Sequence, residues 1–313
     1  MTLDGYRARY AQYTSDPALQ SMHARCPWML ITDDHEVDNN YAGLVSENEG
    51  ESVEQVRLRR AAAYQAWYEH QPVRVPRASS WSDLVQMRRI DWGQMARVHL
   101  LDGRQYRSDQ ACDDGDRDVP CGEWADPKRT MLGDAQEKWL SEGLATSKQH
   151  WQVLANQVML APFDRTPGEK RNFHMDKWSG YPAATERLLD SIASRAANRT
   201  ITISGDIHSS WVNELHRGFA RDDQPIVGAE FVATSISSGG DGSERSFVND
   251  AQRRENPHLK WQNNRRGYFV CRFEEQACTA EYRTMSYVGK PGAPVETPSK
   301  WRVEHQRPGI TAV

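Results

Sequence analysis

A dense run of carboxylate, imidazole and amide side chains occupies Ile31-Thr32-Asp33-Asp34-His35-Glu36-Val37-Asp38-Asn39-Asn40. It follows the apolar residues 29–31, which predict a short strand that ends in a polar loop. α/β proteins present ligands in loops at the carboxyl edge of a sheet, and oxygen and nitrogen donors packed this densely suit a metal ion. The alternative is an Asx-rich turn whose side chains bond their own backbone. This segment alone favours neither.

The same arrangement recurs in Ile201-Thr202-Ile203-Ser204-Gly205-Asp206-Ile207-His208-Ser209-Ser210-Trp211. β-Branched residues alternate with small polar ones, which predicts a strand, and Gly205 permits a tight exit. Residues two apart in an extended backbone point the same way, so Asp206 and His208 are expected to converge as half of a metal-ligand set. The alternative is an ordinary surface Asp-x-His pair. Two such clusters, each after an apolar strand, favour a metal site.

Six motifs follow one another along the chain: Asp33-Asp34-His35-Glu36-Val37 with Asn39-Asn40, Leu101-Asp102-Gly103-Arg104-Gln105-Tyr106-Arg107, Leu154-Ala155-Asn156-Gln157-Val158-Met159, Trp178-Ser179-Gly180-Tyr181-Pro182, Gly205-Asp206-Ile207-His208-Ser209-Ser210-Trp211, and Asn256-Pro257-His258-Leu259-Lys260 with Arg265-Arg266-Gly267-Tyr268. Together they resemble the PhoD-like family of alkaline phosphatases and phosphodiesterases, within the metallophosphoesterases. The resemblance implies an α/β fold, a metallophosphatase-like αββα sandwich. It covers one domain over 1–313, with a strand-rich tail from about 268 to 313.

The resemblance implies metal-dependent hydrolysis of phosphate mono- or diesters. Metals neutralise the phosphoryl oxygens and generate hydroxide, and an acid protonates the departing alkoxide. By resemblance, Asp34, Asp206 and His208 are metal ligands, and His35 stabilises the transition state or acts as general acid. Asn156 matches the place of a further ligand, where its oxygen favours a hard cation such as calcium, although it could instead bond backbone. The metals implied are iron with calcium.

Arg104 is the second candidate catalytic residue, because a guanidinium at a strand end could hold phosphate oxygens bidentately. Arg107 lies beside it. A buried salt bridge from either arginine to Asp102 is at least as good an interpretation. The residues expected to support the ligands from behind are Asp33, Glu36, Asn39, Asn40 and Asp102.

The resemblance also exposes a deficit. Members of the family carry two further ligand segments upstream, one like Ser-Cys and one like Gly-Asp-x-Ile-Tyr, and neither occurs here. The chain is therefore expected to be N-terminally incomplete, resembling the C-terminal two-thirds of the enzyme. One alternative follows: a catalytically inactive chain that lacks its upstream ligands. A misassigned start and a true truncation both fit.

Bulk properties indicate a soluble globular protein, and the resemblance implies a small phosphate-ester substrate. The 313 residues carry a formal net charge of −4, so no general attraction to nucleic acid or anionic membrane is expected. No apolar run approaches the roughly 18 residues of a membrane span, and no signal sequence opens the chain. Family members are typically exported, so the expected location of the chain as written is cytoplasmic or unknown. A monomer is expected.

The five cysteines are too few to staple the fold. Cys112 and Cys121 bracket an acidic loop, and Cys271 and Cys278 flank a predicted hairpin turn, so either pair could form a disulfide in an oxidising compartment. Cys26 is left over and is expected to be buried.

The remaining pattern alternates helix and strand. Helices are predicted over 54–69, 134–148 and 183–197, the second starting with a capping box of Asp134 and Glu137. Strands are predicted within 85–102 and over 151–160, and antiparallel hairpins over 268–303. The segments 108–130 and 236–264 are predicted to be long loops, of the kind that line sites.

Overall fold

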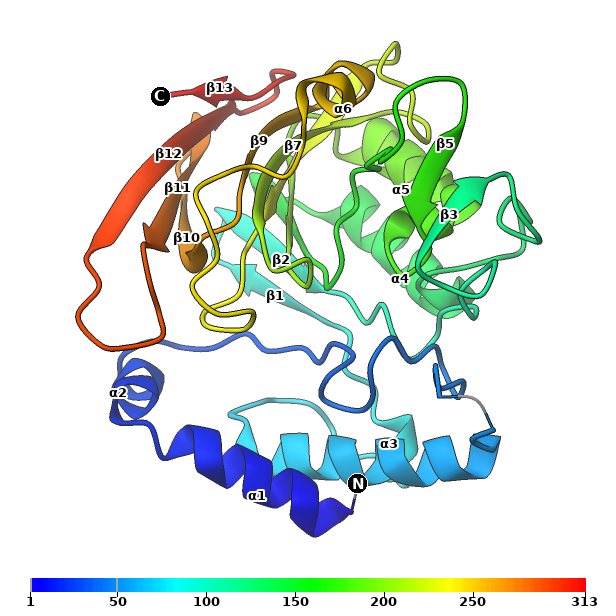
Figure 1. Ribbon diagram of the computed structural model, residues 1–313, viewed down its shortest axis with the longest axis vertical. Coiled ribbons are helices and arrows are strands. Elements are labelled where there is room, and N and C mark those ends of the chain that lie inside the picture. The colour runs from blue at the N-terminus through cyan, green and yellow to red at the C-terminus, as the bar shows by residue number, and fades with distance from the viewer. Residues whose placement is uncertain (1, 49) are drawn as a thin grey trace.

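A seven-stranded sheet forms the centre of the computed structural model, which describes residues 2–48 and 50–313. Two helices, α4 (Gly133–Thr146) and α5 (Pro182–Arg195), cover one face of this sheet. A four-stranded sheet packs on the opposite face (Figure 1). The predicted α/β class is confirmed.

The large sheet is mixed, with strand order β1-β2-β4-β6-β8-β7-β9. Its strands are β1 (Arg88–Trp92), β2 (Ala96–Leu100), β4 (Trp151–Ala155), β6 (Thr200–Ser204), β7 (Ser210–His216), β8 (Ile226–Val232) and β9 (Leu259–Asn263). Strands β2, β4, β6 and β8 run parallel to one another. Both faces of a parallel sheet are covered, which explains the nearly uncharged, buried sequence of β4. The loops after β2, β4 and β6 consequently meet at one edge of the sheet.

The helical layer buries a large apolar cluster in which Leu140 and Leu144 of α4 meet Leu188 and Ile192 of α5. The predicted capping box of α4 is wrong. The helix begins at Gly133, and the hydroxyl of Thr130 accepts hydrogen bonds from the Leu132 and Gly133 amides in place of an Asp134 cap.

The small sheet contains β10 (Arg266–Phe273), β11 (Ala277–Met285), β12 (Val295–Glu304) and β13 (Thr311–Ala312), all antiparallel. The predicted strand-rich tail is therefore present. Alternate residues of β11 face the large sheet, and Cys278, Ala280 and Tyr282 are buried there. The second helical layer of an αββα sandwich is not seen: in Figure 1 no helix of the described chain lies over the outer face of this sheet.

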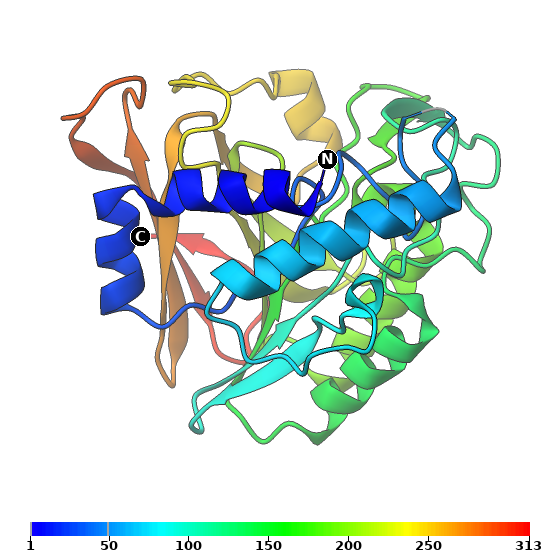
Figure 2. The same cartoon turned by 90° about the horizontal axis from the view of Figure 1, so that it is seen from below.

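The N-terminal helices pack on each other at one end of the sheets (Figure 2). They are α1 (Leu3–Thr14), α2 (Pro17–Arg25) and α3 (Val53–His70), followed by the short helix η1 (Trp81–Asp83). A small core that includes Tyr6, Tyr64 and Trp67 joins them. The Tyr6 hydroxyl donates to the Val37 carbonyl at 2.6 Å, and the Tyr41 and Tyr64 hydroxyls bond each other at 2.9 Å. These contacts clamp the polar loop of residues 33–40 from behind.

The strand predicted over 29–31 is not formed. These residues pair with no strand of the described chain; side chains meet the backbone instead, with Arg88 donating to the Leu30 carbonyl and Gln86 accepting from the Thr32 amide. An apolar run becomes a strand only where a neighbouring strand supplies hydrogen bonds. The strand predicted over 151–160 likewise ends early, at Ala155.

Both segments predicted to be long loops contain short elements. The first holds β3 (Asp116–Val119), which pairs with β5 (Arg171–His174), and the second holds α6 (Asp250–Glu255) and β9. The turn η2 (Trp178–Gly180) precedes α5. No helix in the described part of the chain is long and apolar enough to traverse a bilayer.

Of the predicted disulfides, only one is formed. Cys112 and Cys121 are bonded, whereas Cys271 and Cys278 are free thiols on adjacent strands. Cys26 was expected to be buried and is instead exposed. It follows the last residue of α2, a helix that has no buried residues.

Glu230, fully buried on β8, ties three segments together. Its carboxylate accepts hydrogen bonds from the Leu160 and Ala161 amides, at 2.7 and 2.9 Å, and from the side chains of Ser204 and Asn213. We expect Glu230→Ala to lose about 3–5 kcal/mol of unfolding free energy, because four buried donors lose their acceptor. Urea denaturation measures this. Glu281→Ala, which removes a partly exposed ion-paired carboxylate, is the control and should unfold close to the wild-type midpoint.

His99 makes stability depend on pH. It is fully buried on β2, next to the Gln152 amide oxygen at 3.1 Å, and burial lowers its pKa to about 4. An unfolded histidine titrates near 6.5, so between pH 6.5 and 4 the unfolded chain binds more protons and stability falls as pH falls. Between pH 6.5 and 4 we expect the wild type to lose on the order of 3 kcal/mol of unfolding free energy through this histidine, and His99→Gln should not show that loss. Parallel urea stability curves for both proteins from pH 7.5 to 4 would contradict this.

Candidate functional site

Polar loops from distant parts of the chain meet at the carboxyl edge of β2, β4 and β6. Gln157, just after β4, holds three of them: its amide nitrogen donates to the carbonyls of Thr32 and Leu101, and its oxygen accepts from the Gly103 amide at 3.0 Å. The loop of residues 33–40 is thereby fixed against the loops that follow β2 and β4.

Three carboxylates form a compact group here. One oxygen from each of Asp33, Asp34 and Asp206 lies within 4.8 Å of the others. Asp34 is buried, and the other two are partly buried. Like charges this close need a cation between them, and carboxylate oxygens are ligands for hard cations. The donor set therefore fits a hard divalent or trivalent metal. Asp33, predicted as a supporting residue, stands in the group itself.

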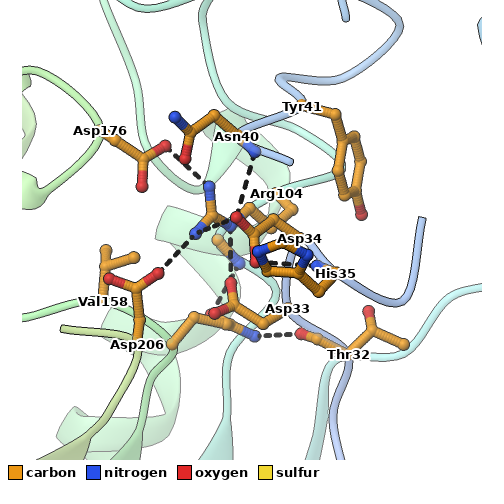
Figure 3. Close-up of polar contacts among 12 residues, drawn as sticks. Thr32, Asp33, Asp34, His35, Asn40, Tyr41, Arg104, Val158, Asp176 and Asp206 are labelled. Atoms are coloured by element: carbon orange, nitrogen blue, oxygen red, sulfur yellow. Dashed lines mark hydrogen bonds and ion pairs between the residues drawn. The ribbon is translucent and has the colours of Figure 1, made fainter. Parts of the chain in front are cut away.

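Arg104 lies at the centre of this group, as Figure 3 shows. Its guanidinium is completely buried and donates to Asp33 at 2.6 Å, Asp176 at 2.7 Å and Asp206 at 3.4 Å. Asp34 is 3.7 Å away. A charge-assisted network of this kind fixes the geometry of every carboxylate it touches.

Sequence reasoning missed Asp176 and Lys177. The Asp176 side chain is completely buried and accepts from Arg104 and from Arg107, each at 2.7 Å. The Lys177 ammonium contacts Asp206 and lies 3.5 Å from Asp176. These two residues directly precede the Trp178 motif. Their position beside a recognisable motif was the one available signal, because no apolar strand leads into them.

The electrostatics of the site are those of a crowded, partly compensated charge cluster. Burial raises the pKa of Asp33, which Arg104 opposes, and burial lowers the pKa of Lys177. Burial alone would raise the pKa of Asp176 too, but the cations Arg107, Arg104 and Lys177 outweigh it and hold that pKa below its usual range.

The balance of formal charge leaves room for a metal. The carboxylates of Asp33, Asp34, Asp176 and Asp206 face the cations of Arg104, Arg107 and Lys177. Four negative charges against three positive ones leave one negative charge uncompensated at the site. A bound cation would neutralise it.

The loop of residues 33–40 bonds its own backbone, as the Asx-turn interpretation expects, and also contributes carboxylates to the acidic group. As in an Asx turn, the Asp34 carboxylate accepts from the His35 amide at 2.8 Å and the Asn40 amide at 3.0 Å, while still facing the acidic group. Glu36 accepts from the Asp33 amide at 2.6 Å, and burial raises its pKa to about 7. The amide nitrogens of Asn39 and Asn40 both donate to Glu47, so these side chains are turned to neighbours in the loop.

Asp206 and His208 do not share an extended backbone. Both adopt left-handed conformations, with φ of 68° and 53°, so the two-residue spacing does not aim them at one point. Asp206 joins the acidic group, while the His208 ring is exposed. Burial lowers the pKa of His208, and the charges of Arg266 and His35 lower it further. His35 is exposed as well. Their catalytic and ligand roles stay predictions.

Asn156 and Asp102 both bond the protein itself. Asn156 accepts from the Trp178 indole at 3.2 Å and donates to the Val158 carbonyl, which matches the alternative given for it. Asp102 accepts from the backbone amides of Arg104 and Gln105 and closes the loop after β2. The alternative of a salt bridge from the arginines to Asp102 is wrong. Arg107 pairs with Asp176. Arg104 pairs with Asp176, Asp33 and Asp206.

A model of the PhoD-like phosphatase family matches residues 1–282. The chain belongs to this family. It is 42% identical over 313 residues to alkaline phosphatase D of Bacillus subtilis (strain 168), a match that covers 100% of this chain and 53% of that protein. A solved structure of PhoD matches with a TM-score of 0.95 and 42% identity over 100% of this chain and 59% of that one. This PhoD-like chain thus spans little more than half the length of both relatives.

We expect Asp176→Asn to lower the unfolding free energy by about 3–5 kcal/mol, because it leaves Arg104 and Arg107 buried without their shared anion. Urea denaturation at neutral pH measures the loss. Asp190→Asn, which breaks an exposed pair with Arg217, serves as the matched control and should stay near wild type. Equal stability of the two variants would contradict a structural role for the Arg104 network.

Proposed function

We propose that this chain hydrolyses phosphate mono- or diesters with the help of metal ions held at Asp33, Asp34 and Asp206. The observation that carries the proposal is the convergence of the Asp33, Asp34 and Asp206 carboxylates in a member of the PhoD-like phosphatase family. Calcium suits the oxygen donors, and the family resemblance implies iron with it. A bound metal would supply charge for the phosphoryl oxygens and an acidified water.

The chain's own residues would position the metal-binding carboxylates, reduce charge repulsion and supply a proton. Arg104 is better described as a positioning residue than as a phosphate ligand, since its three nitrogens are already committed to carboxylates. Lys177 holds Asp206 and shields part of the charge that would repel a phosphate. His35, which is exposed, would serve as proton donor to the departing alkoxide.

A second candidate is a chain that binds metal but turns over little substrate. The observation favouring it is that the acidic group joins only carboxylates, with no thiolate or imidazole among the described residues that compose it. Softer ligands are what usually distinguish an iron or zinc site from a calcium site. The location of the chain, expected from the sequence to be cytoplasmic or unknown, and a monomeric state stay predictions.

Calcium should stabilise the chain by occupying the acidic group. At saturating calcium we expect the melting temperature to rise by about 5 °C, the size of a few kcal/mol of ligand binding. Asp206→Ala should abolish the rise, whereas Asp190→Ala, an exposed carboxylate on α5, should keep it. Differential scanning calorimetry with calcium chloride and with a chelator measures the shift. An equal rise in both variants would exclude the assigned ligands.

Turnover separates the two candidates. p-Nitrophenyl phosphate and its bis ester are assayed with added iron and calcium. Metal-dependent turnover that Asp206→Ala and His208→Ala each abolish supports hydrolysis at this site. Calcium stabilisation without turnover supports the second candidate. Turnover retained in both variants, or in the presence of chelator, would overturn both.

A further inference from the structure

A disulfide closes a segment that contacts the loop of residues 33–40. The bond joins Cys112 and Cys121, nine positions apart. At the start of this segment Cys112, Asp113 and Asp114 all have a left-handed backbone, with φ of 59°, 61° and 58°. Residues other than glycine rarely adopt this conformation, and three in succession persist only where surrounding contacts hold them. A segment kept in such a conformation is a candidate for positioning a side chain at a site.

Contacts beyond the disulfide also hold this backbone. The Arg117 guanidinium donates to the carbonyls of Cys112 at 2.7 Å and Asp113 at 3.0 Å. The Gly115 carbonyl accepts from the Met175 amide at 2.8 Å, next to the pairing of β3 with β5. The segment is therefore fixed to the rest of the chain on both sides of residue 114.

Asp114 is the side chain that this segment presents to the site. One of its oxygens accepts from the Asn40 side-chain amide at 2.8 Å, and the other accepts from the Gly115 amide at 2.6 Å. The Asn40 backbone amide in turn donates to the Asp34 carboxylate at 3.0 Å, a contact that Figure 3 shows. Asp114 thus reaches a carboxylate of the acidic group through one intermediate residue.

Asn40 links this segment to the partners of Asp176 as well. Its side-chain nitrogen also donates to Glu47 at 2.9 Å, and its carbonyl accepts from the side chains of Arg107 and Gln110. Both of these donors also bond the Asp176 carboxylate, at 2.7 and 3.1 Å. A shift of Asn40 would therefore disturb two sides of the acidic group at once.

We propose that Asp114 is a positioning residue that acts through Asn40 to fix the Asp34 carboxylate for a metal. The Cys112–Cys121 disulfide holds Asp114 in place for this role. The inference rests on the proposed function, of which it uses metal binding alone. Groups that orient a ligand from behind set metal affinity although they do not touch the ion. Opening the disulfide should therefore weaken metal binding while every ligand is still present.

Calcium affinity, measured by titration calorimetry on the full chain, tests the metal side of this proposal. Asp114→Ala should weaken calcium binding about ten- to hundredfold, the usual effect of losing a group that orients a ligand. Asp113→Ala is the matched control, because it removes a carboxylate from the neighbouring left-handed position, which is exposed. It should bind calcium as the wild type does. An equal loss in both variants would mean that nearby negative charge, and not orientation, sets the affinity, and would overturn the proposal.

Hydrogen exchange tests the positioning without any metal. In calcium-free protein the Asn40 backbone amide should lose at least tenfold of its protection in Asp114→Ala, while the amides of β11 keep theirs, because the lost contact is local. Cys121→Ser should cause the same local loss. Cys26→Ser, which removes an exposed free thiol, is its control. Unchanged protection of Asn40 in Asp114→Ala would overturn the proposal, and unchanged protection in Cys121→Ser would overturn the role of the disulfide.

The two measurements separate this inference from the proposed function. A wild type that binds no calcium would reject the metal site, while loss of Asn40 protection in Asp114→Ala would leave the positioning of Asp34 standing. Calcium binding that Asp114→Ala leaves unchanged would do the reverse. A loss of both affinity and protection in Asp114→Ala, with neither lost in Asp113→Ala, supports the metal site and the positioning role together.

Discussion

The buried guanidinium of Arg104 is the interaction on which the arrangement of the site depends. It joins Asp33 from the N-terminal loop, Asp176 from the segment before η2 and Asp206 from the turn after β6. These carboxylates repel one another, and burial strengthens that repulsion. Arg104, with Arg107 and Lys177, supplies the opposing charge that holds them side by side.

The sheet determines which loops can reach this cation. β2, β4 and β6 are parallel neighbours, so the residues after each strand arrive at the same edge. Gln157 and Glu230 then fix the loops by hydrogen bonds to their backbone groups. The acidic group is therefore held from two directions, by charge at its centre and by hydrogen bonds to the loops that carry it.

The sequence predicted part of this site for a physical reason. Asp206 follows a strand whose apolar alternation is explicit, and Asp33 and Asp34 follow an apolar run, so their meeting could be anticipated. Two things were not visible in the pattern. Asp176 and Lys177 follow the short edge strand β5, which has no apolar run. The left-handed backbone at Asp206 and His208 could not be read from non-glycine residues, which rarely adopt it.

The predicted fold fared in the same way. The helix at 53–70 and the antiparallel tail were placed well, because the buried residues of each recur on one face. The strand over 29–31 failed because pairing is a tertiary property that an apolar run does not carry by itself. The predicted cap of α4 was wrong because Thr130, which lies outside the capping-box motif, accepts the hydrogen bonds of the Leu132 and Gly133 amides.

Metal binding at this site is an exchange of cations as well as an addition of one. Lys177 already contacts Asp206, and Arg104 already contacts Asp33 and Asp206. An incoming metal must compete with these partners for the same oxygens, which lowers its net binding energy. In return the carboxylates are held near one another before any metal arrives, so little ordering remains to be done. The same cations that stabilise the carboxylate cluster would thus set how strongly a metal must bind to use it.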